Sequence, residues 1–185
     1  MVEPAILPPD YVDQSERRWA YVVASVVAIV IAAIIFTGLH WAAQPSSNVE
    51  TIDPTSLHIA GEFMEANLGT AVQPDGSVIV RVIAEQYSFV PQCIVVPAQT
   101  GVVFRLTSPD VLHGFLIMGT NVNSMVVPGF VSEVRTRFAK PGEHLMPCHE
   151  YCSVGHEAMW ARVKVVDPVG FARVYGGRPR ASCAE

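Results

Sequence analysis

The residue types best suited to bind a metal are concentrated between Pro147 and Met159, which reads Pro-Cys-His-Glu-Tyr-Cys-Ser-Val-Gly-His-Glu-Ala-Met. Thiolates, imidazoles and a thioether are soft or borderline donors, and they favour copper or zinc over magnesium or calcium, which prefer oxygen ligands. The sequence therefore predicts a transition-metal site. Its candidate ligands are His113 upstream and, within the stretch, Cys148, Glu150, Cys152, His156 and Met159.

The spacing of the two thiols limits the kind of centre. Cys148 and Cys152 are four residues apart, and His156 follows after four more, so one tight loop can turn all three toward a single point. A mononuclear blue-copper centre uses one Cys, two His and a long axial Met. Such a centre would leave one of these thiolates without a role.

Two thiolates can instead bridge two copper ions. His113 and His156 would then be the outer ligands, and Met159 and the backbone carbonyl of Glu150 would make weaker contacts. A bridged pair spreads one electron over two metals, so bond lengths change little when the electron arrives or leaves. This pattern favours a site for electron transfer.

Two simpler interpretations of the loop stay open at this point. A Cys-x3-Cys pair outside the cytoplasm can form a disulfide, and a structural zinc site would use tetrahedral Cys and His ligands without Met. An upstream His in a β-type pattern favours copper over both. Three further histidines, His58, His144 and His149, are expected on the surface or in packing roles rather than at the metal.

Cys-x-Glu-x-Cys-x3-His-x2-Met, preceded by Ser-Pro-Asp-Val-Leu-His-Gly at 108–114, resembles the dinuclear copper A domain of cytochrome c oxidase subunit II. An Asp-Pro-Thr segment at 53–55 and a single apolar span are most similar to B-class members. Ser153-Val154 stands where the family usually has Gly-Leu, and the Trp-Tyr cluster of A-class members is missing. The resemblance implies that the Glu150 carboxylate can join a magnesium site at the interface with subunit I.

Four residues are expected around the ligands. The resemblance places Tyr87 and Phe89 beside the copper centre, where an aromatic ring can shield the metal; plain core packing is the alternative. Asp110, or a backbone carbonyl, can accept a hydrogen bond from the second ring nitrogen of His113. Trp160 is expected to pack beneath the loop.

The first quarter of the chain indicates a membrane anchor. Residues 1–18 are polar and are expected to form a poorly ordered arm, whereas residues 19–41 are almost continuously apolar and long enough to span a bilayer. Arg17 and Arg18 precede the span and no Lys or Arg follows it until Arg81, which predicts a cytoplasmic N-terminus. Residues 42–76 are expected to be a linker with a short helix or an irregular segment that lies against the domain. Asp53-Pro54 is typical of a helix start, and Gly69 could end the helix.

From residue 77 to 167 the pattern predicts a mainly β domain, a cupredoxin-like Greek-key sandwich or barrel with the metal loop between its last two strands. Residues 168–185 are expected to form a loose tail. Cys93 is expected to be a buried small apolar residue and Cys183 a bystander. The predicted strands are Val78–Ala84, Ile94–Val96, Val102–Thr107, Gly114–Met118, Ser124–Val127, Val131–Phe138, Gly142–Met146 and Ala158–Val166.

The resemblance implies a subunit through which electrons enter a terminal heme-copper oxidase in a prokaryotic plasma membrane, with the copper domain on the periplasmic face. Cytochrome c or another small redox protein would be the donor, and heme in subunit I the acceptor, for reduction of oxygen to water with proton translocation. The alternatives are a copper A subunit of a nitric oxide reductase and a membrane-anchored copper-binding protein. A formal net charge of −5 and the lack of a nucleic-acid motif argue against nucleic-acid binding.

Overall fold

The computed structural model describes residues 9–40, 49–175 and 180–183. The chain divides into two compact units, residues 1–48 and 49–185, and the second is called the β-domain below. In the first unit, helix α1 runs from Pro9 to His40, and its segment Asp10–Leu39 is long and apolar enough to cross a membrane. Residues 9–18 therefore extend the helix, and the expected disorder of the arm is wrong for them; residues 1–8 and Trp41 lie outside the described residues.

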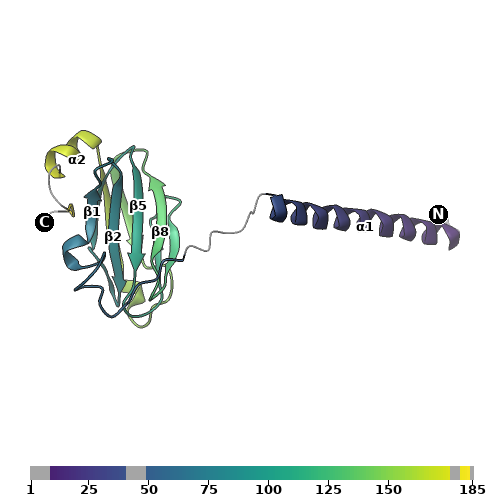
Figure 1. The fold of residues 1–185 in the computed structure, drawn as a ribbon, viewed down its shortest axis with the longest axis horizontal. Coiled ribbons are helices and arrows are strands. Elements are labelled where there is room, and N and C mark those ends of the chain that lie inside the picture. Colours follow the sequence, from purple (N-terminus) through teal and green to yellow (C-terminus); the bar gives the residue numbers. More distant parts are fainter. Residues whose placement is uncertain (1–8, 41–48, 176–179, 184–185) are drawn as a thin grey trace, which may run out of the picture. The chain divides into compact units, whose positions relative to one another are not determined.

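The first of the sheets in the β-domain has five strands (Figure 1). Strand β2 lies at its centre, parallel to β5 and antiparallel to β1 and β3, and β8 pairs with the far side of β5. Alternate residues of β2 and β5 are buried, as expected for a sheet with one face in the core. The strands are β1 (Gly69–Val72), β2 (Val78–Glu85), β3 (Ser88–Val90), β5 (Gly101–Thr107) and β8 (Ser132–Arg137).

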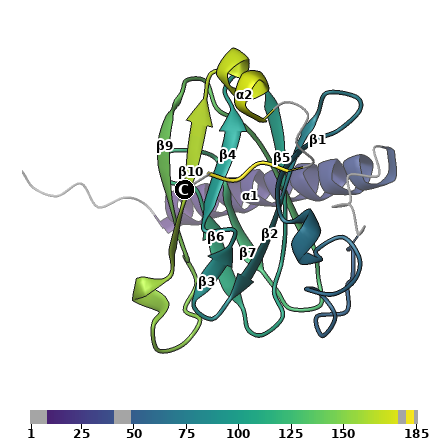
Figure 2. The ribbon, with the colours of Figure 1, turned by 90° about the vertical axis from the view of Figure 1, so that its left-hand side faces the viewer.

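A second sheet has the order β4-β10-β9, with β10 parallel to β4 and antiparallel to β9 (Figure 2). A separate antiparallel pair, β6-β7, completes the sandwich. The bounds are β4 (Cys93–Pro97), β6 (His113–Leu116), β7 (Asn123–Val126), β9 (Gly142–Pro147) and β10 (Trp160–Val166). Each of the eight predicted strands overlaps an observed one; β1 and β3 were not predicted.

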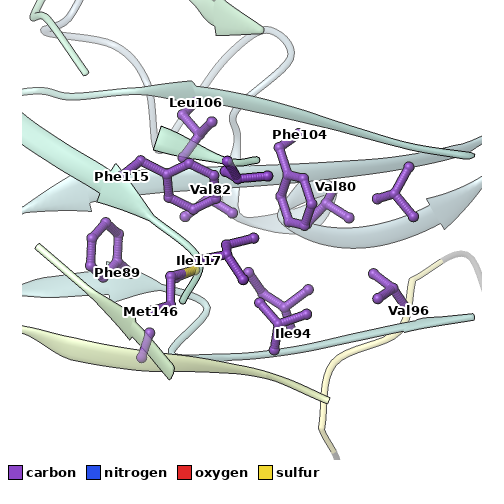
Figure 3. Close-up of a cluster of buried hydrophobic side chains, with 14 of the residues drawn as sticks. Val80, Val82, Phe89, Ile94, Val96, Phe104, Leu106, Phe115, Ile117 and Met146 are labelled. Carbon is purple, nitrogen blue, oxygen red and sulfur yellow. The ribbon is translucent and has the colours of Figure 1, made fainter. Parts of the chain in front are cut away.

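The core lies between the sheets and is formed by buried aliphatic and aromatic side chains (Figure 3). Phe115 of β6 is at its centre, with ring centroids 5.4 Å from Phe104 and 6.3 Å from Phe89. Met146, at the end of β9, is fully buried in the same cluster. The fold is mainly β and cupredoxin-like, with one N-terminal apolar helix, as the sequence predicted.

The segment after Asp53-Pro54 takes the second of its two expected forms: it is irregular and lies against the sheet, and no α-helix begins at Asp53. The Asp53 carboxylate accepts hydrogen bonds from the backbone N–H (2.9 Å) and hydroxyl of Thr55, which is an Asx turn rather than a helix cap. The segment continues in turns to a single 3₁₀ turn at Glu65–Asn67. Its apolar residues Leu57, Phe63 and Leu68 are buried against Ile83 of β2, so they pack on the sheet without helical periodicity.

The C-terminal segment is folded against the β-domain, and the expectation of a loose tail is wrong for its described residues. Helix α2 spans Pro168–Tyr175, and Phe171 is buried against Val95. The segment then returns to the sheet, where Ala181 forms a bridge with Thr70 of β1. The expectations for Cys93 and Cys183 are also wrong, because these residues form a disulfide across a sequence separation of 90.

Candidate metal centre

The candidate ligands lie on two neighbouring parts of the β-domain. His113 is the first residue of β6, and the loop that carries the other ligands leaves the end of β9 and returns to the start of β10. The loop is closed at its base by a hydrogen bond from the Cys148 N–H to the Met159 carbonyl (3.0 Å). The next N–H, of His149, donates to the Gly114 carbonyl (3.1 Å), which attaches the loop to β6.

Gly114 is required at this contact. A Cβ at this position would overlap the backbone atoms of His149 and Glu150. Glycine therefore lets β6 and the loop approach closely enough for His113 to face the cysteines. This role of Gly114 could not be predicted, because nothing in the local sequence indicates which backbone will lie against it.

The structure brings the predicted ligands together in a continuous series. The Cys148 and Cys152 sulfurs are 3.8 Å apart, and each faces one imidazole: Cys148 lies 3.8 Å from His113 Nδ1, and Cys152 lies 3.6 Å from His156 Nδ1. The Met159 thioether sulfur is 3.8 Å from the Cys152 sulfur. The sulfur–sulfur distance is nearly twice that of a disulfide, about 2.05 Å.

The backbone carbonyl of Glu150 completes the set. Its oxygen lies 3.2 Å from the Cys148 sulfur, as expected for a weak contact on that side, while the side chains of Glu150 and His149 are exposed. The metal-binding atoms of His113, Cys148 and Cys152 all lie within 4.8 Å of one another, and the three residues are buried. The donor set is therefore rich in sulfur and nitrogen and fits copper or zinc rather than magnesium.

His113 is oriented by Asp110, as the sequence analysis suggested. The His113 Nε2–H donates to the Asp110 carboxylate (2.9 Å), so the Nδ1 lone pair faces the Cys148 sulfur. Burial favours a higher pKa for the Asp110 carboxyl, but hydrogen bonds from His113, Gln86 and Val111 outweigh it and hold that pKa below its usual value. The carboxylate thus stays charged and keeps one tautomer of the imidazole.

The thiol of Cys152 is held in its protonated form in the metal-free protein. Burial, with a further contribution from the neighbouring Cys148, raises the pKa of Cys152 to about 11. A metal that binds here must therefore displace a proton, as is usual for thiolate ligands.

The expected aromatic neighbours differ in their positions. The ring of Tyr87 lies against the Cα of Gly155 in the loop and is 40% exposed. Phe89 is fully buried in the core, which agrees with core packing. Trp160 contacts the loop, because its indole N–H donates to the Glu157 carbonyl, and its side chain is 49% exposed.

Gln86 also supports the site and was not predicted from the sequence. It lies in the turn between β2 and β3; its backbone N–H donates to Asp110 (2.7 Å) and its side-chain amide donates to the Cys152 carbonyl (2.7 Å). A glutamine at the end of a strand carries no pattern that would have revealed these contacts. In this segment, only the aromatic residues Tyr87 and Phe89 were expected to lie near the metal.

The comparisons with known proteins place the β-domain among oxidase subunits. The family model for the periplasmic domain of cytochrome C oxidase subunit II matches residues 75–166. A cytochrome c oxidase subunit 2 of Thermus thermophilus is 35% identical over 152 residues, which cover 81% of this chain and 90% of the relative. A second subunit 2 from Thermus thermophilus is 37% identical over 121 residues, 65% of this chain and 90% of that protein.

Among solved structures, a chain of a heme-copper terminal oxidase dimer determined by cryo-EM is similar, with a TM-score of 0.52 and 26% sequence identity. The match covers 80% of this chain and 99% of that chain. The likeness therefore extends beyond the β-domain's strands to most of the sequence.

Proposed function

The chain belongs to the cytochrome c oxidase subunit II family, whose members are parts of heme-copper oxidases, and from this membership we propose that it is the subunit through which electrons enter such an oxidase. It accepts electrons from cytochrome c or a similar small redox protein at a dinuclear copper A centre. The electrons pass to heme in subunit I for reduction of oxygen to water with proton translocation. The observation that carries the proposal is the series His113–Cys148–Cys152–His156, whose neighbouring donor atoms lie 3.6–3.8 Å apart.

The donors present fit a dinuclear copper centre. Two cysteine sulfurs lie side by side with one imidazole outside each, and the Met159 thioether and Glu150 carbonyl lie at the two flanks. These six residues would hold the metal. When bound, a pair of copper ions would supply one-electron transfer.

The residues around the donors keep the site dry and fixed. His113 and Met159 are fully buried, and Cys148 and Cys152 are nearly so, which excludes bulk water from one side of the centre. Asp110 holds the His113 ring in the tautomer that a ligand needs. Tyr87 covers the Gly155 side of the loop and is still partly exposed, so it is our candidate for the residue closest to an electron donor.

Three features support placing the β-domain on the periplasmic side of a prokaryotic plasma membrane. Helix α1 supplies one candidate span, and Arg17 and Arg18 lie near its N-terminal end. The Cys93–Cys183 disulfide is of a kind that persists in oxidising compartments rather than in the cytoplasm. The N-terminus would then be cytoplasmic and the chain would cross the membrane once.

The outward side chain of Glu150 is our candidate for a magnesium site shared with subunit I. Its backbone carbonyl faces the Cys148 sulfur while the carboxylate is exposed, so the two ends of the residue can serve different sites. A carboxylate is the ligand type that magnesium prefers.

The test is to load the full-length chain, purified in detergent, with copper. We expect two copper ions per chain and an electron spin resonance spectrum in which one unpaired electron couples equally to two copper nuclei. Cys148→Ser and Cys152→Ser should each abolish that spectrum, whereas His149→Ala, an exposed neighbour in the same loop, should keep it. One copper per chain, coupled to a single nucleus, would show that the dinuclear assignment is wrong.

The alternatives are separated by what the chain does with its partners. The complex isolated from its membrane should turn over oxygen with reduced cytochrome c. Turnover of nitric oxide in place of oxygen would instead indicate the nitric oxide reductase alternative. A chain that purifies without a heme subunit and gives up copper readily would indicate a membrane-anchored copper-binding protein.

A further inference from the structure

Gln86 contacts both halves of the candidate metal centre. Its backbone N–H donates to Oδ2 of Asp110, the carboxylate whose other oxygen accepts from His113. Its side-chain amide donates to the carbonyl of Cys152, at a distance of 2.7 Å. One residue in the turn between β2 and β3 therefore connects the support of an imidazole to the backbone of a thiol ligand.

The loop around Cys152 needs such an external contact. The next residue, Ser153, has φ = 107°, and Gly155 has φ = 108°, a region of backbone conformation that residues with a side chain seldom adopt. Such a conformation persists only when surrounding groups hold it in place. The amide of Gln86 is one of these groups, because it binds the carbonyl directly before Ser153.

We propose that Gln86 is a positioning residue for the metal centre, and that its amide fixes the Cys152 backbone relative to Asp110 and His113. This inference rests on the proposed copper function. Its effect would be to hold Cys152 at its place beside Cys148 before metal binds, and to limit the movement of the loop afterwards. Gln86 itself need not touch the metal.

The contribution of the amide can be separated from that of the neighbouring ring. Tyr87 packs on Gly155 through its aromatic face, whereas Gln86 acts through one N–H donor. Gln86→Met keeps the length of the side chain and removes the donor; Gln86→Lys keeps a donor and changes the shape. Gln92→Met is the matched control. Gln92 is an exposed glutamine that follows β3 in the chain, and its side chain makes none of the described hydrogen bonds to the metal loop.

The experiment uses the full-length chain in detergent and three measurements. The first is hydrogen exchange of the backbone amides of residues 152–156 in the metal-free chain. The second is the rate at which a chelator removes copper from the loaded chain. The third is the position of the visible thiolate-to-copper absorption band, which a change in overall stability would not move.

We expect Gln86→Met to speed both amide exchange and copper loss by about two- to tenfold, the range given by loss of one hydrogen bond, and to shift the absorption band. Gln86→Lys should remain close to the unmodified chain, and Gln92→Met should match it. If Gln86→Met does not fold, Gln86→Glu takes its place, because it keeps the shape and removes the donor.

Two results would overturn the inference. One is a non-donor variant that behaves like Gln92→Met in all three measurements. The other is Gln86→Lys being as impaired as Gln86→Met, which would indicate a packing role. Failure of the unmodified chain to bind copper would count against the proposed function alone, because amide exchange in the metal-free chain still measures whether Gln86 holds the loop.

Discussion

Removal of the Cys93–Cys183 disulfide should lower the free energy of unfolding of the β-domain by about 2–5 kcal/mol. The bond joins residues separated by 90 positions, so it closes a loop that includes most of the domain. In the chain-entropy treatment a loop of that length gives about 4.6 kcal/mol at 25 °C. This figure is an upper value, because cross-links commonly deliver less than the chain entropy alone predicts.

The disulfide holds the C-terminal segment, which also has other contacts with the β-domain. These contacts limit the loss of stability and set the lower end of the expected range. The Cys183 N–H donates to the Cys93 carbonyl (3.3 Å), Ala181 exchanges two hydrogen bonds with Thr70, and the Arg180 guanidinium donates to the Leu68 carbonyl. These contacts remain available after Cys93→Ala/Cys183→Ala. The native state should therefore keep its structure, and the main effect should be on the unfolded chain.

The assay is urea unfolding of the full-length chain in detergent, followed by tryptophan fluorescence. The chain has three tryptophans, so Trp19→Phe and Trp41→Phe leave Trp160 as the reporter within the β-domain. In this tryptophan background, the Cys93→Ala/Cys183→Ala variant is compared with the chain that keeps both cysteines. The latter is measured once with the disulfide oxidised and once with it reduced. Copper binding should be unchanged, because neither cysteine belongs to the group of candidate ligands.

Three results would refute this reasoning. A loss of less than about 1 kcal/mol would mean that the C-terminal segment holds itself in place and that the cross-link restricts little. Mass spectrometry that finds both thiols free in the purified chain would remove the premise. A large loss in the reduced, unmodified chain but not in the alanine variant would point to damage by free thiols instead.

Two further perturbations test other parts of the β-domain. Gly114→Ala should lower the free energy of unfolding by about 1–3 kcal/mol, because the added Cβ overlaps the loop backbone at His149 and Glu150. The same variant should bind copper more weakly in a titration. An unchanged unfolding free energy together with unchanged copper affinity would contradict the close approach of β6 and the loop. Glu62 accepts hydrogen bonds from Arg81 and Arg105, so Glu62→Gln should cost about 1.5–3 kcal/mol at pH 7 in urea unfolding. Burial favours a higher pKa for Glu62, but the two arginines outweigh burial and hold that pKa below its ordinary value of 4.5. The stability that the ion pairs contribute is therefore present above pH 4.5 and is lost as the pH falls through the pKa of Glu62 in the folded protein. A difference in unfolding free energy between Glu62→Gln and the unmodified chain that stays constant down to about pH 2 would contradict the ion pairs.

The strands could be predicted from the sequence because their pattern is local. In β10, for example, every second residue from Ala161 to Val165 is buried, which matches the alternation of apolar and polar side chains. Strand β1 was missed because it has only four residues, beginning with Gly69, and becomes a strand by pairing with β2. A stretch so short carries little periodic signal.

The choice between a helix and an irregular segment after Asp53 was left open for a similar reason. An Asp followed by Pro is favoured at the start of a helix, and Asp is equally favoured in an Asx turn, where its carboxylate binds the N–H two residues on. The outcome depends on whether the apolar residues that follow can pack as a helix. Here Leu57 and Phe63 pack on Ile83 of the sheet, which local sequence does not reveal.

The candidate site divides in the same way between local and distant features. Cys148, Cys152 and His156 could be found from their spacing, because all three lie in one loop closed by two neighbouring strands. Cys93 and Cys183 could not be paired, because neither has a neighbour in sequence that indicates its partner. Gln86 supports a candidate ligand from a turn that is distant in sequence. Such a residue stands at no characteristic spacing from the ligands, so the sequence does not reveal it.

The candidate ligands in the loop depend for their positions on the register of β9 and β10. Pro147 pairs with Trp160 across the two strands, so Cys148 and Met159 leave them at the same level. The core on the inner face fixes that register, because a shift of one strand by one residue would turn its buried side chain, Met146 of β9 or Val163 of β10, out of the interior. The two strands and the hydrogen bond from the Cys148 N–H to the Met159 carbonyl therefore fix the two ends of the loop that carries both cysteines and His156. A loop fixed at both ends suits the proposed electron transfer, because each movement of the candidate ligands between oxidation states would add to the barrier.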